Sequence, residues 1–187
     1  MEKLRNYLGN IGFKDEALAK ILDSFILIEF KKGEYVVEEG KISKYIGFIK
    51  SGMFQYYILE DGEEKTSYVS IENTWLASLL SFISQTPSIE NIRAITDGSI
   101  FLISKANLKI LIDEIPQFKD FYIGLLEASI CGIDASRQNL IFHTAEQRYE
   151  KLMKEEPFLL QQIPLQYLAS MLGVTPRHLS RIRGNIR

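Results

Sequence analysis

A change of hydrophobic pattern near residue 104 constrains the fold more than any other feature of this sequence. Between residues 28 and 103, short β-branched and aromatic runs alternate with glycine turns, and the pairs Asp61-Gly62 and Asp97-Gly98 are typical of hairpins. From Ser104 onward the apolar residues recur at helical spacing. The first part therefore predicts an antiparallel β jelly roll, whose interior either encloses a small molecule or is filled by side chains.

The expected strands are short and lie between turns. They cover residues 35–37, 45–49, 53–59, 65–71, 92–95 and 100–103. Amphipathic patterns in residues 3–29 predict one or two small helices before the first strand. With the helices that follow residue 104, the fold class is α+β.

A long helix is expected after the β-rich part. Ser104 can cap a short helix through Leu111, and Pro116 permits a helix over residues 117–142. This helix has more apolar surface than the β part can cover, and small residues allow a second helix to approach closely. We therefore expect a homodimer along this helix, although packing of both its faces within one chain is the alternative.

A capping box marks the start of the next helix. Thr144 and Gln147 have the spacing in which each side chain bonds to the other residue's backbone. This helix is expected to run to about Glu155 and to be ended by Pro157.

Residues 165–183 have the pattern of a helix-turn-helix. A first helix is expected over residues 165–172, Gly173 supplies the positive φ of a turn, and Thr175-Pro176 begins a second helix. The residues expected to face inward are Leu168, Ala169, Leu172, Val174, Leu179 and Ile182. An ordinary helical hairpin would fit the same apolar spacing.

The charge distribution favours the helix-turn-helix over the hairpin. The whole chain has a net charge of −2, yet four of its 22 basic residues and none of its 24 acidic residues fall in residues 158–187. The four are Arg177, Arg181, Arg183 and Arg187. A helix dipole favours one or two cations in a last turn, but it does not account for thirty residues without an acid.

The arginines of the second helix, which begins at Thr175-Pro176, therefore predict that this helix contacts double-stranded DNA. Arg177 and Arg181 lie four apart on one face, where each can form a bidentate contact with guanine in the major groove. His178 can donate or accept a hydrogen bond between them. Thr175, Ser180 and Arg183 are better placed for phosphate.

Composition excludes several other classes of protein. No apolar run approaches the ~18 residues of a membrane span, and the first residues have no signal-peptide core, so we expect a cytoplasmic protein that does not bind a membrane. One cysteine, Cys131, and two histidines, His143 and His178, supply no metal cluster. We expect no cofactor and no enzymatic activity, because no catalytic set of residues is evident. A metal-dependent jelly-roll enzyme is the least favoured alternative.

The order of β-roll, long helix, capped helix and helix-turn-helix resembles the Crp–Fnr family of transcription regulators, especially its short Bacteroidetes-type members. The residues that carry the resemblance are 144–149 (TAEQRY), 164–169 (PLQYLA), 172–176 (LGVTP) and 179–183 (LSRIR). It implies a cyclic-nucleotide-binding-like β-roll, a homodimer on a palindromic promoter site and contact with RNA polymerase. Thr175, Arg177, His178 and Arg181 fall on the family's DNA-contacting positions.

The ligand side departs from the family's pattern. When the chain is aligned on Phe82 and Arg93-Ala94, the Gly-Glu and Arg-Ser pairs of cyclic-nucleotide binders are replaced by Ala77-Ser78 and Ser88-Ile89. A buried phosphate without its arginine would be an unpaired charge, so we expect weak binding of cyclic AMP or none. Trp75 beside Ser78 and Ser88 either lines a pocket for another effector or belongs to a filled, inert roll.

The resemblance divides the chain into a β-roll domain (1–115), a dimerisation helix (116–143) and a DNA-binding domain (144–187). Longer family members continue into a small β wing, so either the wing is not needed or the sequence is slightly truncated at Arg187. The main alternative function is a small-ligand sensor or interaction module that does not read DNA.

Overall fold

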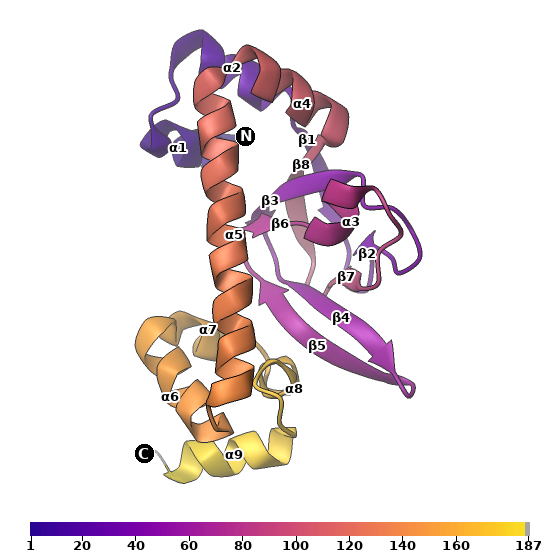
Figure 1. The fold of residues 1–187 in the computed structure, drawn as a ribbon, viewed down its shortest axis with the longest axis vertical. Coiled ribbons are helices and arrows are strands. Elements are labelled where there is room, and N and C mark those ends of the chain that lie inside the picture. Colours follow the sequence, from indigo (N-terminus) through magenta and orange to yellow (C-terminus); the bar gives the residue numbers. More distant parts are fainter. Residues whose placement is uncertain (186–187) are drawn as a thin grey trace.

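The structure, a computed structural model, is described for residues 1–185, and it begins with two short helices (Figure 1). They are α1 (Glu2–Ile11) and α2 (Asp15–Asp23), which agrees with the expected helices in residues 3–29. Gly12 ends α1 with a φ of 108°, a left-handed conformation that glycine adopts without a steric penalty. The buried faces of both helices pack on the β-rich part that follows.

Within the described part of the chain, eight strands form two antiparallel four-stranded sheets. The strands are β1 (Ile26–Phe30), β2 (Tyr35–Val37), β3 (Tyr45–Ser51), β4 (Phe54–Glu60), β5 (Glu63–Ser70), β6 (Trp75–Leu76), β7 (Asn91–Ala94) and β8 (Gly98–Ser104). One sheet has the order β1-β8-β3-β6 and the other the order β2-β7-β4-β5. The predicted α+β class with an antiparallel β jelly roll is confirmed, and residues 26–104 are called the β-roll below.

Two glycines fit the places where the chain turns or approaches itself. Asp61 and Gly62 both have positive φ, and they join β4 to β5 as the predicted hairpin. Gly47 lies on β3 opposite β8, where an added Cβ would be 2.4 Å from a side-chain carbon of Ile100. A larger residue at position 47 would therefore force the two strands apart.

Side chains on the two sheets divide the apolar interior into separate clusters. Between the sheets lie Val37, Ile49, Phe54, Tyr56, Leu76, Ile92, Ala94, Ile100 and Leu102. On the opposite face of the first sheet, Phe48, Phe101 and Ile103 pack against α1, α2 and the start of the long helix. The alternation of strand residues between the two clusters follows from the twofold period of a β-strand.

Three elements of the β-roll were not predicted. They are β1, the two-residue strand β6, and the helix α3 (Leu79–Ser84). The last two are short, and β6 pairs only with Gly47 and Phe48 of β3. Such short elements form because of tertiary contacts rather than a local pattern.

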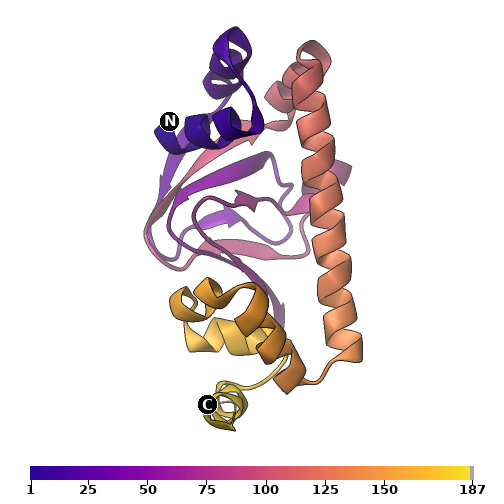
Figure 2. The same ribbon diagram turned by 90° about the vertical axis from the view of Figure 1, so that its left-hand side faces the viewer.

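The long helix is present and spans nearly the whole molecule. After α4 (Lys105–Glu114), capped by Ser104, the helix α5 runs from Pro116 to Phe142 (Figures 1 and 2). The β-roll lies beside it, the first helices lie at its N-terminal end, and the last helices gather at its C-terminal end. No helix within residues 1–185 is both long and apolar enough to cross a membrane.

Four more helices follow between residue 143 and residue 185. They are α6 (Ala145–Glu155), α7 (Pro157–Gln162), α8 (Leu165–Met171) and α9 (Pro176–Asn185). The predicted capping box between Thr144 and Gln147 is present in both directions. Pro157 was predicted only to end α6. It also begins α7, where its missing N–H is not needed.

Candidate nucleic-acid interface

Helices α8 and α9 meet through a tight turn at the C-terminal end of α5. Gly173 has a φ of 67°, and the Val174 backbone N–H donates to the Ala169 carbonyl across the turn. Thr175 caps α9, because its hydroxyl accepts a 3.2 Å hydrogen bond from the backbone N–H of His178. The turn and cap lie where the sequence predicted them.

The apolar contact between the two helices also follows the predicted pattern. Leu168, Ala169, Leu172, Leu179 and Ile182 are buried, and they join one cluster with residues of α6 and α7. The sixth predicted residue, Val174, is half-buried at its edge. Because α9 is fixed through Leu179 and Ile182, its opposite face is turned to solvent.

The two arginines expected to contact bases lie on that open face. Arg177 and Arg181 are exposed, and neither guanidinium has a hydrogen-bond or ion-pair partner among residues 1–185. One helical turn separates them, so their side chains project from the same side of α9. Their donors are free to bind a partner outside the chain.

His178 is directed to another helix. Its Nε2 lies 3.5 Å from the Glu146 carboxylate in the first turn of α6. Backbone and Thr144 hydrogen bonds at that helix start hold the pKa of Glu146 below its usual range, and His178 contributes less. Sequence reasoning missed this acidic group beside α9, because it lies outside the acid-free segment.

Arg183 likewise packs on α6 rather than standing free. Its guanidinium lies over the Tyr149 ring, 5.8 Å from the ring centre, and its buried Nε has no hydrogen-bond partner within the described chain. Ser180 is exposed but donates its hydroxyl to the Pro176 carbonyl at 3.0 Å. The structure therefore separates Arg177 and Arg181 from Arg183, although all three were predicted to face DNA. Arg187 lies outside the described residues.

The predicted ligand-pocket residues do not all come together. Ser78 and Ser88 are buried, and their hydroxyl oxygens are 3.1 Å apart. Trp75 instead packs on the opposite face of the first sheet, where its indole N–H donates to the Tyr7 hydroxyl at 3.1 Å. The strand period explains this separation, because Leu76 points between the sheets and Trp75 points away from them.

A carboxyl group lies beside the serine pair. Ser88 donates a 2.7 Å hydrogen bond to the Glu90 backbone carbonyl. Burial raises the pKa of the Glu90 carboxyl, and a hydrogen bond with Ser78 partly opposes this shift. The surroundings of Ser78 and Ser88 thus include an acid, which would repel a bound phosphate. No group of three metal-ligating side chains occurs in residues 1–185.

The middle of the chain matches a known family. Residues 27–114 match the family described as the cyclic nucleotide-binding domain. No curated protein sequence matches the chain.

Several solved structures have the same fold. FixK2 from Bradyrhizobium japonicum is 16% identical, with a TM-score of 0.72, 87% of this chain covered and 84% of that one. The c-di-GMP responsive global regulator CLP from Xanthomonas campestris is 15% identical, with a TM-score of 0.69 and coverages of 91% and 90%. A protein from Eubacterium rectale described as a transcriptional regulator of the crp/fnr family is 19% identical, with a TM-score of 0.65 and coverages of 91% and 82%.

Proposed function

We propose that the protein is a homodimeric transcription regulator that binds palindromic promoter DNA. The proposal is supported by the match of residues 27–114 to the cyclic nucleotide-binding domain family and by the fold that the chain shares with FixK2 and the Eubacterium rectale protein. In this proposal, residues 1–115 form a sensor-like β-roll domain, residues 116–143 the dimerisation helix and residues 144–187 the DNA-binding domain. Contact with RNA polymerase belongs to the same proposal.

The exposed pair Arg177 and Arg181 carries the proposal. A planar guanidinium matches the two acceptors that guanine presents in the major groove. The helix that bears them has a cap at its start, an apolar face fixed to α8 and no acidic residue. The Thr175 oxygen already accepts a bond, but its hydroxyl hydrogen can still be donated to a phosphate.

His178, Ser180 and Arg183 have smaller proposed roles. Ser180 is exposed and can reach phosphate only by giving up its bond to the Pro176 carbonyl. His178 and Arg183 would have to leave Glu146 and Tyr149 to contact DNA. We therefore assign base reading to Arg177 and Arg181 and backbone contact to the other predicted residues.

Dimerisation follows from the apolar surface of α5. Ile123, Ile130, Ile133 and Leu140 are exposed at spacings of seven, three and seven residues. This is the heptad spacing with which two helices pack along a common seam. A single helix-turn-helix buries little DNA surface, so two copies on a twofold-symmetric site would supply the affinity.

Selection of bound sequences from a random DNA pool tests the proposal. We expect a palindrome whose half-sites are about one helical turn apart, with affinity that falls steeply as salt rises. Arg181→Ala should cost about 1–3 kcal/mol and relax the preference at one base pair. Arg5→Ala, which removes an exposed arginine of α1, is the matched control and should bind as the wild type does.

Two results would contradict this proposal. An equal loss on random and selected DNA would mean that Arg181 contacts only phosphate. A chain that retards no DNA even at low salt would favour the alternative of a small-ligand sensor or interaction module.

A further inference from the structure

The Ser170 hydroxyl of helix α8 is hydrogen-bonded to the edge of the β-roll. The Ser170 Oγ accepts a 2.8 Å hydrogen bond from the Thr66 backbone N–H and donates a 3.2 Å hydrogen bond to the Thr66 carbonyl. Thr66 lies on β5, the outermost strand of the order β2-β7-β4-β5. A residue 104 positions away in the sequence therefore satisfies both backbone groups of this edge residue.

A hydroxyl suits this position because it both donates and accepts. The outward N–H and carbonyl of an edge strand are the groups that a further strand would pair with. Ser170 takes the place of that strand at one residue only. Alanine at position 170 could bond to neither group.

Thr66, which binds Ser170 through its backbone, is also held through its side chain by the neighbouring strand β4. The Thr66 hydroxyl accepts a 2.8 Å hydrogen bond from the Gln55 amide, and Gln55 is only 1% exposed. The Gln55 carbonyl oxygen accepts in turn from the Arg93 guanidinium at 3.0 Å, and Arg93 pairs with Glu64 at 2.7 Å. Thr66 on β5 is thus linked through Gln55 on β4 to Arg93 on β7, independently of its contact with α8.

Apolar contacts surround this joint. Val69, Ile71 and Ile95 of the β-roll share one cluster with Leu168 and Ala169 of α8. Apolar burial holds two surfaces together but has little directional preference, whereas hydrogen bonds have defined geometry. The cluster therefore keeps α8 on the β-roll, and the Ser170 bonds determine where along β5 it lies.

We propose that Ser170 is a positioning residue that orients α9 relative to α5 and so sets the half-site spacing that the dimer accepts. Helix α9 moves with α8, because Leu179 and Ile182 pack in the same cluster as Leu168. In a dimer joined along α5, the orientation of each α8–α9 unit fixes the distance between the two copies of α9. This inference rests on the proposed DNA binding.

The experiment compares the full-length wild type, Ser170→Ala, Ser170→Thr and Ser84→Ala on palindromes whose half-site spacing varies by single base pairs. Ser84 is the matched control, because among the described residues its hydroxyl bonds only within α3 and the turn after it. We expect Ser170→Ala to bind the preferred spacing about fivefold more weakly, as for one lost hydrogen-bonded anchor. Its preference over spacings one base pair longer or shorter should fall to about twofold.

Two further measurements separate positioning from other roles. Binding to a single half-site should be unchanged in Ser170→Ala, because Ser170 does not contact DNA in this proposal. Ser170→Thr, which keeps the hydroxyl, should restore the spacing preference. If circular dichroism shows that Ser170→Ala has lost its fold, Ser170→Cys replaces it, because a thiol has similar size and bonds weakly.

An unchanged spacing preference in the folded variant that lacks the hydroxyl would overturn the inference. It would also be overturned if this variant lost as much affinity for a single half-site as for the palindrome. If the wild type itself retards none of the palindromes, the proposed DNA binding fails instead. The two failures are therefore distinguishable.

Discussion

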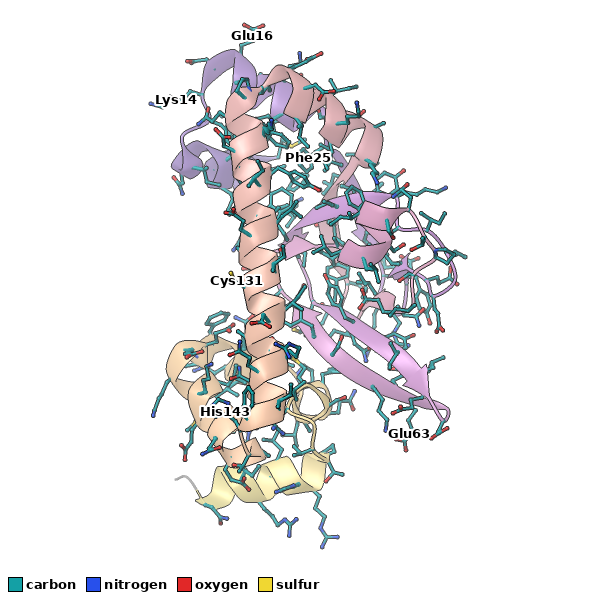
Figure 3. The ribbon with its side chains drawn as sticks, viewed as in Figure 1. Lys14, Glu16, Phe25, Glu63, Cys131 and His143 are labelled. Carbon is teal, nitrogen blue, oxygen red and sulfur yellow. The ribbon has the colours of Figure 1, made fainter. Side chains whose placement is uncertain are left out.

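The guanidinium of Arg148 binds the carbonyl oxygen of Leu172 through two donors, with Nε at 3.2 Å and Nη2 at 2.6 Å. Its Nη1 also donates to the carbonyl of His143. His143 follows the last residue of α5, at the lower end of the helix in Figure 3, and Leu172 follows the last residue of α8. One side chain on α6 therefore ties the end of the long helix to the turn that positions α9.

Replacing Arg148 should destabilise this junction. Arg148→Ala leaves the part-buried Leu172 carbonyl and the exposed His143 carbonyl without this donor. We expect a loss of about 1–3 kcal/mol in the free energy of unfolding, mainly from the Leu172 carbonyl. Arg148→Lys keeps the charge but has no planar fork, so it should recover only part of the loss. Urea unfolding followed by circular dichroism measures both changes.

Lys154→Ala is the control for Arg148, because Lys154 is an exposed cation near the end of the same helix. It should unfold as the wild type does. Equal stability of Arg148→Lys and the wild type would show that charge alone, rather than the fork of donors, matters at this position.

The seam on α5 predicts that one buried charge dissociates the dimer. Ile130 lies on the heptad seam and is 62% exposed in the single chain. Ile130→Glu would place two carboxylates in the dimer contact and remove two apolar side chains, each worth about 2 kcal/mol on burial. We expect dimer dissociation to become at least about a hundredfold easier, measured by sedimentation equilibrium.

The neighbouring residue supplies a matched control. Cys131 is exposed and points away from the β-roll near the middle of α5 (Figure 3), one position from the seam. Cys131→Glu adds the same charge to the same helix and should remain a dimer. Dissociation of both variants to the same extent would argue against a seam centred on Ile130.

Features set by neighbouring residues were predictable from the sequence. The box formed by Thr144 and Gln147, the turn at Gly173 and the cap at Thr175 each depend on backbone geometry within a few positions. Local rules become ambiguous when one residue suits two roles. Pro157 was expected only to stop a helix, but proline is equally suited to a first helical position.

Contacts between distant segments could not be predicted in the same way. Arg183 and Tyr149 carry no local signal that they will stack, and neither do His178 and Glu146. These contacts arise when α9 packs against α6, which a charge count along the chain does not detect. The placement of Trp75 is a further example, because its two-residue strand forms by pairing with β3 and has no local pattern that shows which way Trp75 points.

Glu90 predicts a pH dependence of stability. Because the folded state raises the pKa of this carboxyl, it binds the proton more tightly than the unfolded chain does. The associated stability is fully present below the ordinary pKa of 4.5 and is lost as pH rises through the raised value. Glu90→Gln resembles the protonated form, so it should be more stable than the wild type at pH 7 and lose this advantage near pH 4.

Urea midpoints of both proteins at the two pH values test this sign. Glu39→Gln, which changes an exposed carboxyl after β2, is the control and should show no such pH-dependent difference. An advantage of Glu90→Gln that is equally large at pH 4 would mean that the substitution acts through packing rather than through charge.

The same carboxyl bears on the prediction for cyclic AMP. The serine pair lies beside Glu90, and no arginine replaces the one that the family's cyclic-nucleotide binders have at this place. A phosphate there would be desolvated beside a like charge, so we expect a dissociation constant no tighter than about 1 mM. At 1 mM ligand this limits the stabilisation to about 0.4 kcal/mol, which corresponds to a rise in Tm of roughly one or two degrees. Thermal unfolding with cyclic AMP and with adenosine measures it, and a rise of several degrees with cyclic AMP alone would reveal a phosphate site that the prediction denies.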